Sequence, residues 1–102
     1  MGIFQHNDAT FEVDDEVLAH LQIVIVERLR RGETLTLSWI ETDHGHGGMT
    51  TVLLNPTHGL IFEVATPDPV IDPVLIERLA VAADSSEGLT LRRANPSESW
   101  RP

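Results

Sequence analysis

Residues 13–33, VDDEVLAHLQIVIVERLRRGE, carry the clearest secondary-structure pattern in the chain. Asp14 is a favourable N-cap, acidic residues follow in the first turn, basic residues occupy the last turn, and Gly32 can end a helix. Apolar residues recur at spacings of three and four, which is the periodicity of a helix with a buried side. The pattern predicts a helix that packs on the core through Val17, Leu18, Leu21, Val24, Ile25 and Leu29.

The same helix has a second apolar side, formed by Ala19, Ile23 and Val26. A single sheet covers only one side of a helix, so this second side requires a separate partner. Two alternatives remain for this partner: the second predicted helix of the chain, or another copy of the protein in a twofold symmetric dimer. We identify Ala19, Ile23, Val26 and the adjacent Arg30 as the candidate interface, and expect a homodimer or another protein partner.

Short segments that alternate apolar and polar residues surround this helix and predict strands. The expected strands lie at residues 3–6, 10–13, 34–41, 49–56, 58–65 and 89–93. Short connections among the three central strands favour an antiparallel meander. A second helix, capped by Asp72 and with Pro73 at its first position, is expected over residues 73–85, and Gly88 ends that segment. Its predicted buried side consists of Leu75, Leu79 and Ala82.

The predicted elements follow the order strand, strand, helix, three strands, helix, strand. This order predicts an α+β fold, a two-layer sandwich of a mainly antiparallel sheet with two helices on one face. A single domain is expected over residues 1–93, because a chain of 102 residues can build one core. Residues 94–102, ANPSESWRP, are expected to form a flexible C-terminal tail.

Charge and residue usage exclude several classes of function. Sixteen acidic and seven basic residues give a formal net charge of -9, which disfavours nucleic-acid binding. All seven basic residues are arginine, so chemistry that requires a lysine amine is excluded. The absence of cysteine removes disulfides and thiolate sites. No apolar run approaches the roughly 20 residues of a membrane span and no signal-like segment is present, so we expect a cytoplasmic protein without membrane association.

Candidate metal ligands cluster around the segment ETDHGHGGMTT, residues 41–51. His44 and His46 stand two residues apart beside Asp43, and His58 follows the next predicted strand, a set that suits Zn²⁺, Cu²⁺ or Ni²⁺. The alternative is an ordinary hairpin loop with solvated histidines, because a metal site needs ligands that a second shell holds in place. The rest of the sequence predicts no cofactor.

Other polar residues of the first helix have two interpretations each. His20 shares a helical side with Glu16 and Glu27, which suits either acid–base chemistry or a solvated surface. The arginines at the end of the helix suit either phosphate binding or a favourable interaction with the helix dipole. This cluster consists of Arg28, Arg30 and Arg31, and Arg92 and Arg93 could extend it. No catalytic constellation emerges, so we do not expect an enzyme.

Residues 14–39, DDEVLAHLQIVIVERLRRGETLTLSW, and residues 52–62, VLLNPTHGLIF, resemble a family of small actinobacterial proteins. The resemblance covers most of residues 1–93 and implies an N-terminal hairpin, a helix and a strand that ends in Trp. The family has no known function. Some members carry the automatic label "ATP-dependent DNA ligase", which this chain contradicts because ligases form a lysyl-adenylate and the chain has no lysine. Residues 66–80, TPDPVIDPVLIERLA, differ from the basic, proline-containing segment of the family.

The sequence therefore predicts a non-enzymatic protein-interaction or accessory domain that associates with itself. This prediction depends on the second apolar side of the first helix. The alternative is a small-ligand or metal-binding protein that uses the histidine and glycine loop, and a nucleic-acid accessory factor is the third hypothesis.

Overall fold

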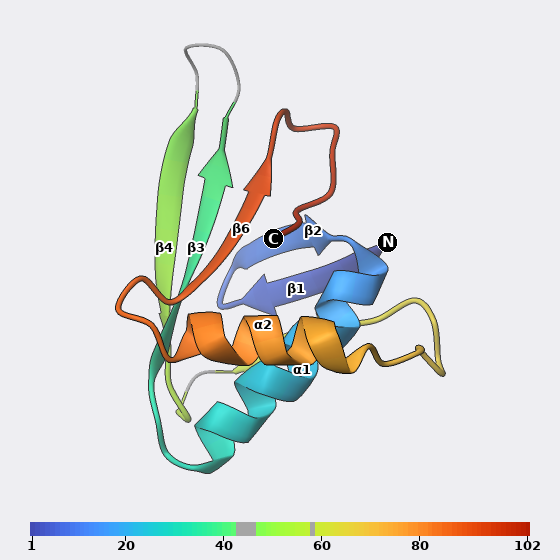
Figure 1. Cartoon of the computed structure of the whole chain (residues 1–102). Coiled ribbons are helices and arrows are strands. Elements are labelled where there is room, and N and C mark those ends of the chain that lie inside the picture. Colours follow the sequence, from blue (N-terminus) through green and yellow to red (C-terminus); the bar gives the residue numbers. More distant parts are fainter. Residues whose placement is uncertain (43–46, 58) are drawn as a thin grey trace.

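The computed structural model describes residues 1–42, 47–57 and 59–102 and shows the predicted order of elements (Figure 1). The strands are β1 (Gly2–His6), β2 (Ala9–Val13), β3 (Leu35–Glu41), β4 (Gly48–Leu54), β5 (Leu60–Glu63) and β6 (Leu89–Arg93). The helices are α1 (Asp15–Arg30) and α2 (Pro73–Ala83). The predicted α+β fold is confirmed, and among the pairings between these described strands only that of β3 with β6 is parallel.

The strands divide into two three-stranded sheets, with the orders β2-β1-β5 and β4-β3-β6. In the second sheet β3 pairs antiparallel with β4, as the short connection predicts. The predicted meander is wrong for its third strand, because β5 pairs antiparallel with β1. This pairing places Phe62 opposite Phe4, with ring centroids 5.3 Å apart, so it buries aromatic surface that β4 does not offer.

Helix α1 begins and ends as its sequence predicts. The Asp14 carboxylate accepts a hydrogen bond from the Val17 N–H at 3.3 Å, and Gly32 follows the helix with a φ of 76°. The predicted core side is confirmed, because its members are buried except Leu29, which is half-buried. Neither described helix is long and apolar enough to cross a membrane.

Helix α2 lies across α1, and a buried arginine fixes one end of this contact (Figure 1). Arg28 is 7% exposed and donates to the two carboxylate oxygens of Asp84 at 3.1 and 3.0 Å. It also donates to the Ala80 carbonyl oxygen at 3.4 Å. Phosphate binding by Arg28 is therefore excluded, because its guanidinium is buried between the two helices.

An aromatic cluster joins the two sheets. Phe4 from β1 and Trp39 from β3 are 0% and 1% exposed, and their ring centroids lie 5.6 Å apart. Phe11 from β2 stacks on Trp39 with a centroid distance of 3.8 Å and an interplanar angle of 2°. The core therefore continues from one sheet to the other through these rings.

The C-terminal segment packs on the domain, so the predicted flexible tail over residues 94–102 is wrong for its last part. The Trp100 side chain is buried, with 5% exposed. The backbone N–H of Trp100 donates to the Glu12 carbonyl oxygen at 2.9 Å, and its backbone carbonyl oxygen accepts from the Asp14 N–H at 3.1 Å. Arg101 forms an antiparallel bridge with Arg92. Burial of a single indole in an otherwise polar segment is the physical reason for this return to the core.

Candidate functional site

The predicted metal ligands fall outside the described residues. Asp43, His44, His46 and His58 belong to positions 43–46 and 58, so the metal-binding hypothesis stays a prediction. Among the residues that are described, no group of three or more His, Cys, Asp or Glu side chains could hold a metal ion.

His20 is a buried structural contact, so the acid–base and solvated-surface interpretations are both wrong. Its ring is fully buried, Nδ1 lies 2.6 Å from the Glu16 carbonyl oxygen, and Nε2 accepts a hydrogen bond from the Asp72 N–H at 2.8 Å. A ring nitrogen that accepts a backbone N–H carries no proton, so the proton of the neutral ring lies on Nδ1. His20 therefore links α1 to the residue that caps α2.

Replacing His20 with leucine is expected to destabilise the protein by about 1–3 kcal/mol, because the partly buried Asp72 N–H loses its acceptor. Urea denaturation followed by circular dichroism measures this loss. The control is Gln22→Leu at an exposed position of the same helix, which should change the free energy of unfolding by less than about 0.5 kcal/mol. Equal stability of His20→Leu and the parent protein would contradict the structural role of this bond.

The predicted interface residues lie on a side of α1 that α2 leaves open. Ile23 remains 41% exposed and Arg30 is exposed, whereas Val26 is half-buried and Ala19 is buried. The alternative in which the second helix buries this side is therefore wrong. The physical reason is that hydrogen bonds through His20 and Arg28 hold α2 on a different side of α1.

Apolar residues of β5 and of the segment that follows it extend this surface. One open groove separates the helix from β5 and is lined by Val26, Leu29, Arg30, Pro56, Leu60 and Phe62. A second lies beside Ala19 and Ile23 and includes Phe62, Val64, Pro67, Pro69 and Ile71. We call Ala19, Ile23, Val26 and Arg30, together with the Glu16 side chain one turn before Ala19, the outer face of α1.

Asp15 fixes the segment that borders this outer face. Its carboxylate accepts hydrogen bonds from the Ala65 N–H at 2.6 Å and the Thr66 N–H at 3.1 Å. The Ala65 bond, supported by Thr66, lowers the pKa of the Asp15 carboxyl below its ordinary value against the opposing effect of burial. Because the folded-state pKa is depressed, this contact stabilises the fold above the unfolded pKa of about 3.9, and its contribution is lost as the pH falls through the lowered pKa.

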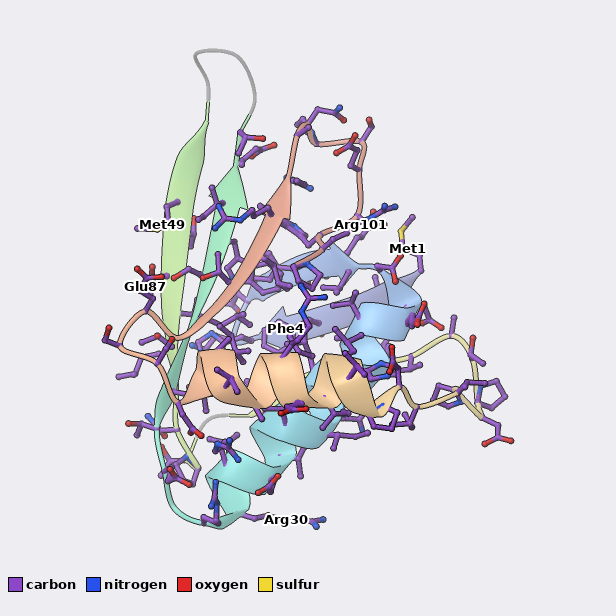
Figure 2. All side chains as sticks on the ribbon, viewed as in Figure 1. Met1, Phe4, Arg30, Met49, Glu87 and Arg101 are labelled. Carbon is purple, nitrogen blue, oxygen red and sulfur yellow. The ribbon has the colours of Figure 1, made fainter. Side chains whose placement is uncertain are left out.

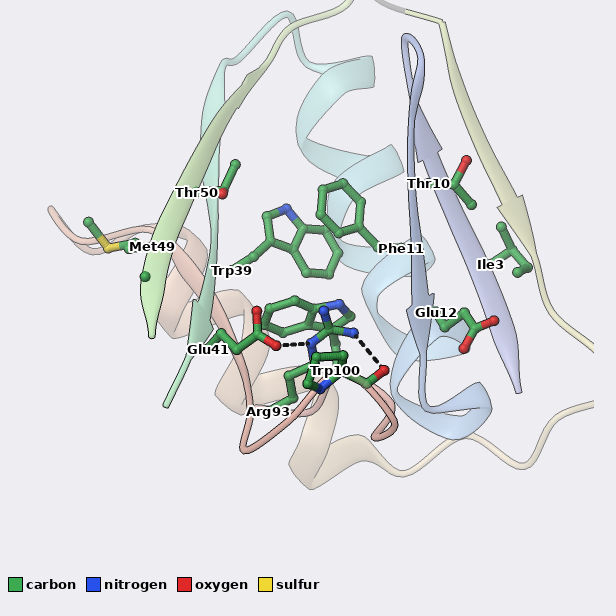
Figure 3. A pocket seen from close by; sticks show the side chains of 12 residues that line it. Ile3, Thr10, Phe11, Glu12, Trp39, Glu41, Met49, Thr50, Arg93 and Trp100 are labelled. Carbon is green, nitrogen blue, oxygen red and sulfur yellow. Dashed lines mark hydrogen bonds and ion pairs between the residues drawn. The ribbon is translucent and has the colours of Figure 1, made fainter. Parts of the chain in front are cut away.

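A cleft between the two sheets is a second candidate site, which the sequence did not reveal. It has a volume of about 690 Å³ and lies between β2 on one side and β3, β4 and β6 on the other (Figure 3). Phe11, Trp39 and Trp100 form its aromatic wall, and Trp100 meets Trp39 edge-on with a centroid distance of 5.3 Å. The cleft depends on the return of Trp100, which is why the strand pattern alone does not predict it.

Two charged residues meet in this cleft. Arg93 Nε lies 3.3 Å from Glu41 Oε1, and the guanidinium carbon is 4.3 Å from the centroid of the Trp100 ring. Arg93 also donates to the Pro96 carbonyl oxygen at 3.5 Å. The predicted extension of the arginine cluster by Arg93 is therefore wrong, since this side chain is held within the cleft.

Comparisons with known proteins identify a family without assigning it an activity. No curated protein and no solved structure matches the chain significantly. Residues 1–94 match the family described as "Domain of unknown function (DUF7882)". This range contains both sheets and both helices, which Figure 2 draws together with their side chains. Because it covers most of the sequence, the chain belongs to the DUF7882 family.

Proposed function

We propose that this protein is a non-enzymatic interaction domain that associates with a second copy of itself through the outer face of α1. The observation that carries the proposal is Ile23, a large apolar side chain that is 41% exposed at the centre of this face. Burial of the fraction that is still exposed would contribute roughly 0.6–1.2 kcal/mol per copy, which is two-fifths of the value of about 1.5–3 kcal/mol for a fully exposed side chain of this size. Single exposed apolar residues are common, but here the surface continues into Val26 and the grooves along β5.

The outer face has the residue spacing of a helix–helix seam. The face repeats every seven residues, at Glu16, Ile23 and Arg30. A second set with the same spacing, Ala19 and Val26, lies between these positions. These positions follow the alternation of three and four residues that lines the seam of a coiled coil. Ala19 is already buried within the monomer, so the apolar contact with a second helix would rest on Ile23 and Val26.

Charges at the two ends of the seam favour a second copy in the antiparallel direction. If the twofold axis passes near Ile23, Glu16 of each copy lies opposite Arg30 of the other. Both residues are exposed, and neither forms an ion pair with any other described residue. A parallel arrangement would instead bring like charges together, and it would also align the helix dipoles unfavourably.

Ile23→Glu is expected to convert a dimer into a monomer, because it places two carboxylates beside the proposed axis. Size-exclusion chromatography with light scattering should give twice the chain mass of 11.3 kDa for the parent protein and that mass once for the variant. The matched control is Val81→Glu, which introduces the same charge at a 65% exposed apolar position of α2 and should leave the dimer intact.

Charge exchange tests the direction of the two helices. Glu16→Arg and Arg30→Glu should each weaken the dimer, and the double variant should restore part of the loss, as expected for residues that interact directly. A parent protein that stays monomeric up to millimolar concentration would refute the proposal. A dimer that survives Ile23→Glu would show that another surface mediates the association.

A further inference from the structure

Three buried polar side-chain atoms in the described part of the chain lack a hydrogen-bond partner, and their residues all line the cleft between the sheets. These atoms are Trp39 Nε1, Glu41 Oε1 and Arg93 Nε. Native proteins leave few buried donors or acceptors without a hydrogen bond, because such groups have lost water and gained nothing in exchange. Their convergence on a single cleft indicates a binding site for a polar molecule.

The charged pair in the cleft keeps its capacity for further hydrogen bonds. Arg93 Nε and Glu41 Oε1 form an ion pair at 3.3 Å, but the N–H is not aligned with the oxygen as a hydrogen bond requires. Contacts with the Trp100 ring and the Pro96 carbonyl oxygen fix the guanidinium in this position (Figure 3). The groups that face a ligand are thus held in place before it binds.

The chemistry of these groups defines the class of ligand. Trp39 and Arg93 offer N–H donors, whereas Glu41 offers an acceptor, and a hydroxyl group can satisfy both kinds because it donates and accepts. Thr10 and Thr50 add hydroxyl groups on opposite sides of the cleft (Figure 3). The carboxylates of Glu12 and Glu41 repel anions, and Arg93 repels cations, so a neutral molecule fits best.

We infer that this cleft binds a small neutral polyhydroxylated molecule of the saccharide class. Its volume of about 690 Å³ lies within the range of sites for small molecules. The polar groups of the cleft would meet the hydroxyl groups of the sugar, and the half-buried ring of Phe11 would contact the apolar part of its ring. This site is separate from the outer face of α1 and does not depend on self-association.

Tryptophan fluorescence provides a direct test, because both tryptophans of the chain line the cleft. Titration of the full chain with glucose and with maltose should give a saturable change for at least one of them, with the same affinity in calorimetry. Trp39→Phe keeps an aromatic ring but removes the N–H donor, so it should weaken binding about tenfold. The absence of a saturable response to both sugars overturns the inference.

Further variants separate binding from folding. Glu41→Gln keeps the shape of the side chain but removes its charge, and should weaken saccharide binding about tenfold. Glu33→Gln replaces a carboxylate with a carboxamide at an exposed site outside the cleft and should bind as the parent protein does. Ile23→Glu should also retain binding. If Trp39→Phe does not fold, the test rests on Glu41→Gln. An unchanged affinity of that variant for the saccharide overturns the inference.

Discussion

Trp100→Ala is expected to lower the free energy of unfolding by about 3–5 kcal/mol, because it removes a large buried side chain from between the sheets. The indole is 5% exposed and contacts the rings of Phe11 and Trp39, with centroids 6.4 and 5.3 Å away. The backbone bonds of residue 100 to Glu12 and Asp14 do not involve the side chain, so the loss comes from packing. Thermal and urea unfolding measure the loss, and the melting temperature should fall by more than about 12 °C.

The controls for this prediction lie in the same segment. Arg101→Ala removes an exposed side chain and keeps the backbone bridge to Arg92, so it should change stability by less than about 0.5 kcal/mol. Trp100→Phe retains an aromatic ring and should lose less than Trp100→Ala. A flexible tail over residues 94–102 predicts no effect for any of these variants, so an unchanged melting temperature for Trp100→Ala would contradict the packed position of the indole.

The parts of the fold that follow from local sequence were predictable. α1 combines a cap at Asp14, a change from acidic to basic residues and an apolar period, and each of these signals lies within the helix. The alternation in β3 likewise places Leu37 and Trp39 on one side of the strand, where both are buried. The order of the elements followed from these separate local patterns.

Contacts between distant segments were not predictable from one sequence. The pairing of β5 with β1 joins residues more than fifty positions apart, and no feature of Phe62 identifies Phe4 as its partner. The position of His20 could not be predicted either. Its neighbours on the helix, Glu16 and Glu27, suggested a polar surface. The hydrogen bond that His20 accepts from the Asp72 N–H forms only because α2 crosses α1 at that point. Local periodicity cannot give the position of a crossing.

The candidate sites divide in the same way. The outer face of α1 is a property of one helix, so its residues could be identified from spacing alone, although the position of α2 decided that the face stays exposed. The cleft combines side chains from β2, β3, β4, β6 and the C-terminal segment. Trp39 and Glu41 share a side of β3, but no sequence pattern places Arg93 and Trp100 beside them.

Gly88→Ala is expected to destabilise the protein by more than about 3 kcal/mol, because two separate effects oppose a side chain at this position. The residue has a φ of 72°, which is in the left-handed region that disfavours a Cβ atom. A Cβ atom would also overlap the Thr36 hydroxyl oxygen and would lie 2.8 Å from the Thr36 carbonyl oxygen. The carbonyl belongs to the backbone just after the start of β3, so a rotation of the Thr36 side chain cannot relieve the overlap.

Gly32 separates the two effects, because it has nearly the same backbone conformation and no steric neighbour. Its φ is 76°, and a Cβ atom there would have no atom within 4 Å. Gly32→Ala should therefore lose only the conformational part, about 1–2 kcal/mol. Urea denaturation gives the free energy of unfolding of each variant, and the difference between the two losses measures the cost of pushing β6 away from β3. The parallel pairing of these strands begins at Leu37 and Leu89, which directly follow Thr36 and Gly88. Equal losses at the two glycines would mean that this end of the sheet yields without cost, and the close approach of Gly88 to Thr36 would then contribute nothing to the fold.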